Sequence, residues 1–557
     1  MSDDLVANLP PATASGSLSP PVPAAPTGGG GGNSYDEVPY DSNPFQQTHP
    51  SRLFTIGTLF GLRPAPVQRC RVLELACAGG GNLMPMADYL PDSEFVGIDL
   101  SAKQIADGQA IASQLGLKNL TLKQANILDV DASYGTFDYI IAHGVFSWVP
   151  GAVRQKILEI CSQRLNPNGI AYVSFNTYPG WHMRGMIRDM MRYHSGRFNQ
   201  PQERVRQARA LLDFLAQSVK QDGPYSQLLK MELETLRHQA DHYLYHEHLE
   251  EVNDPLYFHQ FADMAKAKGL KYLGEARVGT MVTGNFGPDI EKTLRMLASD
   301  QIQAEQYMDF LRNRTFRETL LCKESATPNW TVQPDAVRVL HVASGSKPVP
   351  PAEGQPAHNL HDESPLTYRT PSGMSITTHR ALLKCAMAVL QDTFPGTQPF
   401  DALRRQARER LGGVDTSSPR QAAEDANLIA LGLLNTYLSS DLIELHGMPI
   451  TFARTISERP VALPIARIMA ASTGVIPNRR HEVVRLSELD KHLIPLLDGT
   501  NDRAALVEKL TQVAVSGVVT VRKEEGVLTD PAAIKEALGS ILDQVLGNVA
   551  RMAVLVG

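Results

Sequence analysis

The sequence lacks the features that would place the protein in a membrane, outside the cell or on nucleic acid. No uninterrupted apolar run reaches the roughly 18 residues of a membrane-spanning helix, and the N-terminus lacks the basic and then apolar pattern of a signal peptide. The five cysteines show no CxxC spacing, which predicts reduced thiols in a cytoplasmic protein rather than a disulfide framework. A net charge of −6 gives no overall attraction to nucleic acid or to an anionic membrane.

The 557 residues, 43% of them hydrophobic, are enough for about two to four globular domains. Residues 1–32 are rich in Pro, Ala, Ser and Gly and are expected to form a disordered tail, because they cannot bury enough apolar surface. A linker is predicted over residues 326–365. These boundaries leave an α/β core at residues 33–183, a middle region at 184–325 and a C-terminal domain at 366–557.

The most informative stretch runs from Arg71 to Met84. A short apolar run carries an acid, Glu74, and continues into the loop Ala78-Gly-Gly-Gly81, after which a helical pattern begins. This order is typical of a buried parallel strand, a glycine-rich turn and a helix N-terminus. Such a loop lets a ligand approach the backbone closely, and the helix behind it directs free N–H groups toward that ligand.

A second apolar run, from Glu94 to Asp99, also ends in an acid. In βαβ nucleotide-binding folds an acid at this place accepts hydrogen bonds from ribose hydroxyls. Asp99 lies 25 positions after Glu74, close to the roughly 20 residues usual between fingerprint and acid. Three more strands are predicted, at residues 120–125, 137–143 and 169–175.

The order of these motifs resembles that of the class I S-adenosylmethionine-dependent methyltransferases. The resemblance implies an α/β fold with a Rossmann-like sheet. The first motif reads Glu-Leu-Ala-Cys-Ala-Gly-Gly-Gly here, where the commoner form is Asp-x-Gly-x-Gly-x-Gly. A dehydrogenase is the alternative for the fold, but it would need Gly-x-Gly-x-x-Gly, and Asn82 and Leu83 follow the glycines.

Further stretches resemble one bacterial group, the methyltransferases with a "methyltransferase regulatory domain". This group includes protein-lysine methyltransferases that act on outer-membrane proteins, so the resemblance implies S-adenosyl-L-methionine as cofactor and a protein lysine as acceptor. A small-molecule methyltransferase and a non-catalytic S-adenosylmethionine-binding adaptor are the alternatives. The stretches that carry the resemblance are residues 34–45, 142–150, 176–181, 246–258 and 305–320.

The resemblance also implies the cofactor-binding residues. Glu74, Ala76 and Gly79 would hold the methionine end and shape the loop. Asp99 would bind the ribose hydroxyls, and His143 would hold the amino-acid end of the cofactor or face the substrate. The full expected set is Glu74, Ala76, Gly79, Asp99, Leu100, Asn126, Ile127 and His143, with Asn126 binding or flanking the adenine.

A lysine acceptor must lose a proton, and the sequence shows no single base for this step. Tyr178, Tyr35 and Tyr40 could each accept a hydrogen bond from the amine, and His143 is a further candidate. Tyr35 and Tyr40 belong to residues 34–45, which form either a surface lead-in or a lid over the cofactor site. Because the loops after the fourth and fifth strands both lie at the carboxyl edge of the sheet, they are expected to line one cavity.

The middle region is expected to be a helical insertion followed by a return to the sheet. Residues 184–250 are helical in pattern and rich in arginine, which indicates a solvated face; a homodimer surface and a platform for an acidic substrate are the alternatives. A strand at 270–276 is predicted to complete the sheet. His242 and His246 share a helix face, but the pattern is not His-Glu-x-x-His, and no metal is predicted.

The C-terminal domain is predicted to be mostly helical and winged-helix-like. Helices at 378–391, 400–411 and 421–438 precede a short strand at 442–445, and a second unit is suggested around 493–513. Winged helices often bind DNA, but the acidic total favours contact with protein over contact with nucleic acid.

Overall fold

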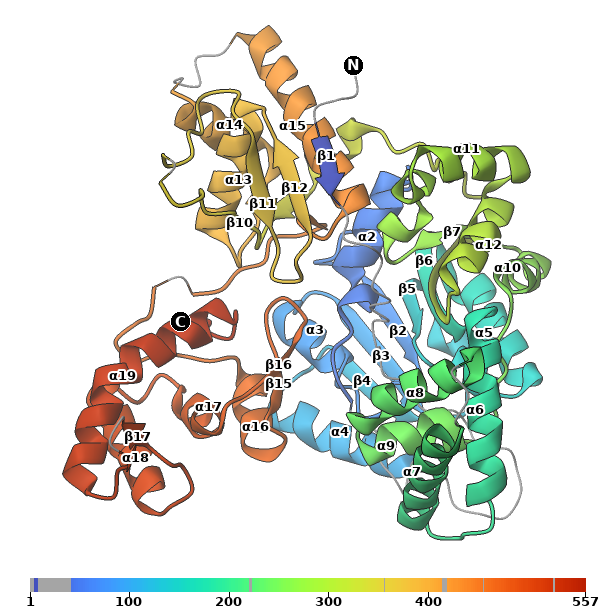
Figure 1. The fold of residues 1–557 in the computed structure, drawn as a ribbon, viewed down its shortest axis with the longest axis horizontal. Helices are drawn as coiled ribbons and strands as arrows, with labels where there is room; N and C mark the ends of the chain where they lie inside the picture. The colour runs from blue at the N-terminus through green and yellow to red at the C-terminus, as the bar shows by residue number, and fades with distance from the viewer. Residues whose placement is uncertain are drawn as a thin grey trace.

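A computed structural model describes residues 5–8, 42–219, 223–354, 356–412, 418–453, 455–523 and 526–557. Its centre is a seven-stranded sheet in the order β4-β3-β2-β5-β6-β8-β7, with helices packed against it (Figure 1). The strands are β2 (Arg71–Leu75), β3 (Glu94–Asp99), β4 (Leu120–Gln124), β5 (Phe137–Ala142), β6 (Leu165–Asn176), β7 (Leu270–Glu275) and β8 (Phe316–Lys323). The Rossmann-like fold class is confirmed.

The first five of these strands run parallel, and β8 is antiparallel to both of its neighbours. All five parallel strands occur where the sequence predicts them. The strand expected at 270–276 lies in the sheet as its edge strand β7. Strand β8, which lies between β6 and β7, was not predicted from the sequence. Strand β2 has β3 on one side and β5 on the other, so the strand order reverses between β2 and β5. In open α/β sheets a ligand binds at such a reversal, and we therefore expect one above the carboxyl ends of β2 and β5.

The helices of the core follow from caps and apolar stripes. Ser101 caps α4, since its hydroxyl accepts the backbone N–H of Gln104 at 3.2 Å, as the sequence predicts. Helix α5 buries Val153, Ile157 and Cys161. The core helices are α2 (Pro50–Leu59), α3 (Leu83–Tyr89), α4 (Ala102–Gln114) and α5 (Gly151–Arg164).

The insertion is a helical subdomain with its own apolar core. That core includes Ile187, Val205, Leu212 and Leu233, and it is separate from the main core. Figure 1 shows these helices gathered on one side of the sheet. They are α6 (Gly180–Ser195), α7 (Pro201–Ser218), α8 (Pro224–Arg237) and α9 (Asp241–Leu244).

The chain then returns to the sheet through α10 (Phe258–Ala267), α11 (Pro288–Leu297) and α12 (Gln301–Arg312). A buried ionic network fixes this return. Arg317 of β8 is fully buried and contacts the carboxylates of Glu275, Glu305 and Asp309 at 2.7–3.1 Å. Because all members are buried and paired, removing one would leave a buried charge uncompensated. The network therefore fastens α12 to the antiparallel end of the sheet.

The C-terminal half packs against the core through continuous apolar contact, since one hydrophobic cluster extends from Phe45 to Leu555. Its first part contains the small strands β9 (His341–Ala343), β10 (Lys347–Pro348), β11 (Leu366–Arg369), β12 (Ser375–Thr378), β13 (Gln398–Pro399) and β14 (Glu444–His446), and the helices α13 (Ala381–Thr393), α14 (Phe400–Arg410) and α15 (Pro419–Ser439). Its last part contains α16 (Pro464–Ser472), β15 (Val475–Pro477), β16 (Val483–Arg485), α17 (Glu488–Leu493), α18 (Arg503–Val515), β17 (Arg522–Lys523), β18 (Gly526–Val527) and α19 (Pro531–Arg551).

Two boundary predictions need correction. The linker over 326–365 is wrong in its first part, because Val337, Leu340 and Val342 are at most 1% exposed and β9 pairs with β13 and β14. The Pro- and Gly-rich composition lies later in the stretch, so it did not reveal these buried residues. The disordered tail over 1–32 is contradicted at β1 (Leu5–Asn8), which pairs with β12. In the part of the chain that the structure describes, no helix is long and apolar enough to cross a membrane.

Candidate functional site

The glycine loop is held in an unusual backbone conformation. After β2 ends, Ala76, Ala78 and Gly80 adopt positive φ values of 60°, 51° and 77°. Left-handed conformations cost about 1 kcal/mol or more for residues with a Cβ, and they concentrate at functional sites. At Gly80 a side chain would also collide with Leu122, because a Cβ there would lie 2.9 Å from its Cδ2. The loop is thus a strained turn at the carboxyl end of β2.

Glu74, at the end of β2, is buried and only half bonded. Its Oε1 accepts a hydrogen bond from Asn82 Nδ2 at 2.8 Å, and its Oε2 has no partner among the residues that the structure describes. Burial raises the pKa of this carboxyl to about 8. A buried oxygen without a partner is costly unless a ligand supplies a donor, so Glu74 is suited to hold an ammonium group.

Asp99, at the end of β3, ties its strand to the glycine loop. Its two carboxylate oxygens accept the backbone N–H groups of Ala78 and Ser101, each at 2.9 Å. An acid at the tip of this strand is the group that accepts ribose hydroxyls in βαβ nucleotide-binding folds. Leu100, which follows, is half-buried. Asp99 therefore sets the loop conformation and could also bind a ligand.

The predicted adenine side of the site lies after β4. Asn126 caps a short 3-10 helix, since its Oδ1 accepts the backbone N–H of Leu128 at 2.9 Å. Ile127 is 4% exposed and packs in the core, whereas Leu128 is 46% exposed. This capping hydrogen bond explains why an asparagine stands at position 126. Asn126, Ile127 and Leu128 form a turn beside the tip of β3.

His143, after β5, is a buried neutral imidazole. Its Nδ1 lies 3.0 Å from the Tyr172 hydroxyl and 3.2 Å from Ser174 Oγ, and its Nε2 has no partner among the described residues. Burial lowers its pKa to about 3. The rings of Phe45 and Phe316 lie 4.1 and 6.3 Å from the imidazole, measured between centroids. An aromatic, desolvated wall thus faces the carboxyl end of β5.

Residues 42–45, called the strap below, lie on the glycine loop. The Gly81 N–H donates to Ser42 Oγ at 2.7 Å, and the Phe45 N–H donates to Asn82 Oδ1 at 2.9 Å. The described end of the predicted lid therefore contacts both the loop and, through Phe45, His143. Tyr35 and Tyr40, proposed from the sequence as groups that orient the acceptor, lie outside the described residues.

Tyr178 lies in an aromatic cluster with His182 and Tyr257. Its ring stacks on His182, 3.9 Å between centroids, and lies near Tyr257. Among the described residues, the hydrogen bonds and ring contacts of Tyr178 do not include His143 or the glycine loop. The two loops meet elsewhere, where the Asn176 N–H donates to Ser147 Oγ at 2.9 Å.

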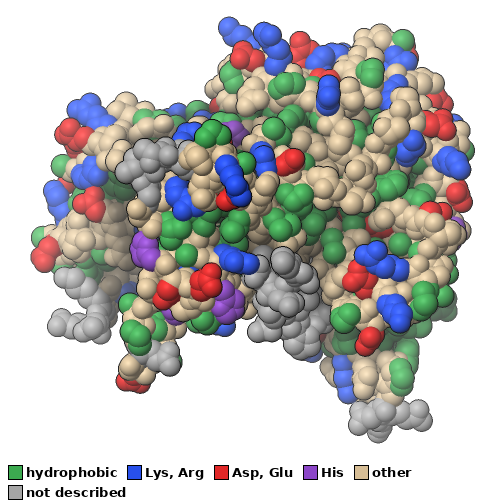
Figure 2. All heavy atoms as spheres, turned by 90° about the horizontal axis from the view of Figure 1, so that it is seen from above, with side chains coloured by type: hydrophobic (Ala, Val, Ile, Leu, Met, Phe, Trp, Pro, Cys, Tyr) green, Lys and Arg blue, Asp and Glu red, His purple; other side chains and the backbone are tan. Residues whose placement is uncertain are grey.

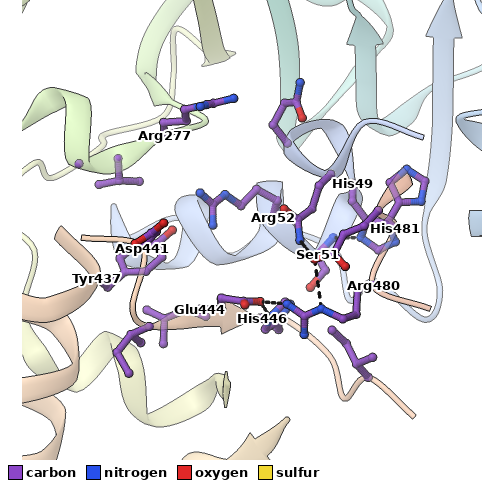
Figure 3. A pocket seen from close by; sticks show the side chains of 18 of the residues that line it. His49, Ser51, Arg52, Arg277, Tyr437, Asp441, Glu444, His446, Arg480 and His481 are labelled. Carbon is purple, nitrogen blue, oxygen red and sulfur yellow. Dashed lines mark hydrogen bonds and ion pairs between the residues drawn. The ribbon is translucent and has the colours of Figure 1, made fainter. Parts of the chain in front are cut away.

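A cavity of about 660 Å³ opens beside the strap, between the core and the C-terminal half (Figure 3). In Figure 3, Arg52 of α2 and Arg277 come from the core, and Glu444 and Arg480 come from the C-terminal half. Arg480 is held by Glu444, by Glu482 and by the carbonyl of Pro395. The cavity wall therefore contains a fixed ionic contact within the C-terminal half.

Several site residues were not predicted from the sequence. Asn82 follows the glycines directly, but the sequence does not show that its side chain bonds to Glu74. Tyr172 and Ser174 of β6 lie within hydrogen-bonding distance of His143, and the ring of Phe316 of β8 faces its imidazole. Patterns in a single sequence do not show which strands lie side by side in the sheet. Among the described residues no group of His, Cys, Asp and Glu side chains could hold a metal ion.

Comparison with known proteins gives the family of each region. Residues 73–171 match a family model described as "Methyltransferase domain", and residues 240–323 match "Predicted methyltransferase regulatory domain". Residues 458–554 match "PKMT, C-terminal winged helix domain". The winged helix thus lies in the last part of the chain. The helix–helix–helix–strand unit at 378–445, which was predicted to be winged-helix-like, lies outside that match.

Relatives cover nearly the whole chain. RP789 of Rickettsia prowazekii is 34% identical over 527 residues, which is 94% of each chain. RP028 of the same organism is 46% identical over 43% of this chain and 96% of its own length. The structure of PKMT2 from Rickettsia typhi in complex with AdoHcy is similar with a TM-score of 0.81 and 31% identity, covering 93% of this chain and 100% of that one.

Proposed function

Because the chain belongs to the class I S-adenosylmethionine-dependent methyltransferases with a methyltransferase regulatory domain, we propose that its acceptor is a lysine side chain of a protein. S-adenosylmethionine is the cofactor of this enzyme. The observation that best supports an amine acceptor is the wall around His143, which is buried, neutral and bounded by Phe45 and Phe316. We also place the reaction in the cytoplasm, in keeping with five buried free cysteines.

The residues at the carboxyl edge fit the cofactor. When bound, S-adenosylmethionine supplies an activated methyl group on a positively charged sulfur. Glu74 Oε2, buried and without a partner among the described residues, would accept a hydrogen bond from the cofactor's ammonium group. Asp99, at the tip of β3, would accept the ribose hydroxyls. The Ala76–Gly80 turn and the Asn126–Ile127 turn would lie along the methionine and adenine ends.

The acceptor amine must arrive at the cofactor without its proton. His143 is a weak base, since burial lowers its pKa to about 3, and burial raises the pKa of the half-buried Tyr178. Desolvation lowers the pKa of an amine, so the aromatic wall itself favours the neutral nucleophile. The Nε2 of His143 would orient the amine by a hydrogen bond, and the strap would exclude water.

The charge distribution supports a protein acceptor over nucleic acid. The four arginines of α14 each contact an acid: Arg404 and Arg405 contact Asp401, Arg408 contacts Asp425, and Arg410 contacts Asp392. Figure 2 shows basic and acidic side chains interspersed over the face it presents. A phosphate backbone would require unpaired cations in a continuous patch.

The test is transfer of a tritiated methyl group from S-adenosylmethionine to proteins of a host lysate by the full chain. We expect a labelled protein band that survives base treatment, with the label mapped to lysine by mass spectrometry. Label confined to small molecules would contradict a protein acceptor. Absence of label with intact cofactor binding, in a lysate from cells lacking the enzyme and therefore holding unmethylated substrate, would favour the adaptor alternative.

A further inference from the structure

The winged-helix domain reaches into the cofactor site through one hairpin. The turn between β15 and β16, residues 478–482 and called the hairpin turn below, lies beside α3 (Figure 1). His481 in this turn is 2% exposed and has a φ of 59°. Its Nε2 lies 2.8 Å from Oδ1 of Asn82, at the start of the helix that follows the glycine loop.

Asn82 connects three parts of the chain. Its Nδ2 donates to Glu74 Oε1 at 2.8 Å and to the Thr48 hydroxyl at 3.0 Å. Its Oδ1 accepts the Phe45 N–H at 2.9 Å and faces His481. Both amide protons and both acceptor positions are therefore in use, which fixes the side chain of Asn82 in one orientation.

The donors and acceptors around Asn82 determine which ring nitrogen of His481 carries the hydrogen. The backbone N–H of Phe45 can only donate, so the atom of Asn82 that accepts it is Oδ1. The same Oδ1 faces His481, and Nε2 of His481 must therefore carry the hydrogen. The imidazole is neutral, because burial holds its pKa well below the usual value. The ring of His49 lies 5.0 Å from that of His481, so a second buried imidazole adjoins the contact.

The hairpin turn is built to hold His481 in place. Asn478 Oδ1 accepts the backbone N–H groups of Arg480 and Glu482, each at 2.9 Å, and its Nδ2 donates to the Met552 carbonyl at 3.0 Å. The guanidinium of Arg480 bonds to the Pro395 carbonyl at 2.9 Å. These bonds fasten the turn to both ends of the C-terminal half, so His481 is positioned before any ligand binds.

We propose that His481 is a positioning residue for Glu74, the carboxyl group that would hold the cofactor's ammonium group: His481 orients Glu74 through Asn82, and it thereby couples docking of the winged-helix domain to cofactor affinity. The inference rests on the proposed role of Glu74 as the acceptor for the cofactor's ammonium group. Coupling of this kind is reciprocal, so bound cofactor should also hold the domain against the core. A rearrangement of the C-terminal half would then change cofactor affinity without touching the cofactor.

The test compares His481→Leu with His481→Gln in the full chain. Both replacements carry the same left-handed backbone strain, but only glutamine can still donate to Asn82 Oδ1. We expect S-adenosylmethionine to bind His481→Leu about threefold to tenfold more weakly by calorimetry, the effect of losing one buried hydrogen bond, and His481→Gln to recover most of the affinity. His492→Leu, in α17 of the same domain, is the control and should bind as the unchanged protein does.

A double substitution separates this inference from its premise. If His481 acts through Glu74, the combination of His481→Leu with Glu74→Gln should weaken binding little more than Glu74→Gln alone. Normal affinity of His481→Leu, or equal weakening in His481→Gln, would overturn the positioning role while leaving Glu74 in the site. Normal affinity of Glu74→Gln would instead remove the premise, and the inference with it.

Discussion

At the scale of single residues, the site consists of buried polar atoms whose bonding is incomplete. Glu74 Oε2 and His143 Nε2 are buried at the carboxyl ends of β2 and β5, and neither has a partner in the described chain. Asp99 differs, because both of its oxygens already hold backbone N–H groups. Glu74 and His143 are thus prepared for a ligand, whereas Asp99 shapes the loop.

Replacing Asp99 by alanine should weaken binding of S-adenosylmethionine by about tenfold or more. The loss combines the hydrogen bonds to the ribose with release of the Ala78 N–H, and hydrogen bonds to charged groups contribute about 1.5–3 kcal/mol each. Calorimetric titration measures the effect. Asp107→Ala, on the exposed side of α4, is the matched control. Unchanged affinity of Asp99→Ala would refute the assignment of Asp99 to the ribose.

At the scale of elements, the strap is seated on a glycine that has no room for a side chain. A Cβ at Gly81 would lie 2.1 Å from the Ser42 carbonyl oxygen and 2.5 Å from its carbon. Both are backbone atoms, so the strap must move away if a side chain is added. The close approach of the strap thus depends on glycine at position 81.

Gly81→Ala should therefore displace the strap and lower the rate of methyl transfer more than it lowers thermal stability. Water would reach the wall at His143, and Phe45 would leave its ring contact. Turnover with a saturating protein substrate, together with the unfolding midpoint, measures both effects. Gly185→Ala, where a Cβ meets no atom within 4 Å, should leave both unchanged or raise stability slightly. Full activity of Gly81→Ala would mean that strap closure is unimportant.

Some of these elements could be predicted from the sequence and others could not. The parallel strands and the Ser101 cap could be predicted, because apolar runs and capping residues act within a few positions of each other. Strand β8 could not, since its run Arg317-Glu-Thr319 contains buried charged and polar residues that are paired only in three dimensions. Likewise, Asn82 was visible in the sequence, but its contact with His481 joins residues 399 positions apart.

At the scale of the whole molecule, buried neutral histidines lie where the C-terminal half meets the core. His49 caps α2, and its Nε2 lies 2.6 Å from the Tyr89 hydroxyl. Burial, and to a smaller degree the charge of nearby His446, lowers the pKa of His49 to about 3. Unfolding restores the ordinary value near 6.5, so between pH 3 and 6.5 the unfolded chain binds more protons. The contribution of His49 to stability is fully present above pH 6.5 and is lost as the pH falls toward 3.

The predicted consequence is acid lability that originates partly at this junction. Because the unfolded chain binds a proton at His49 and the folded chain does not, the free energy of unfolding should be about 2 kcal/mol lower at pH 5 than at pH 7 from this residue alone. His49→Asn keeps a capping side chain and cannot titrate, so its unfolding midpoint should fall less between pH 7 and pH 5 than that of the unchanged protein. His238→Asn, at an exposed position, is the control. An identical fall in His49→Asn would contradict the account.

The most direct test of the central claim is the pH dependence of S-adenosylmethionine binding in the unchanged protein and in Glu74→Gln. Because burial raises the pKa of Glu74 to about 8, this carboxyl is mostly protonated in the free protein at pH 6.5 and ionised above pH 8. An ionised carboxylate binds an ammonium group more tightly. The α-amino group of the cofactor itself loses its proton at about pH 8. The affinity of the unchanged protein, measured by calorimetry relative to Glu74→Gln, should therefore rise between pH 6.5 and about 7.5. A constant ratio of the two affinities would contradict the placement of the cofactor's ammonium group at Glu74.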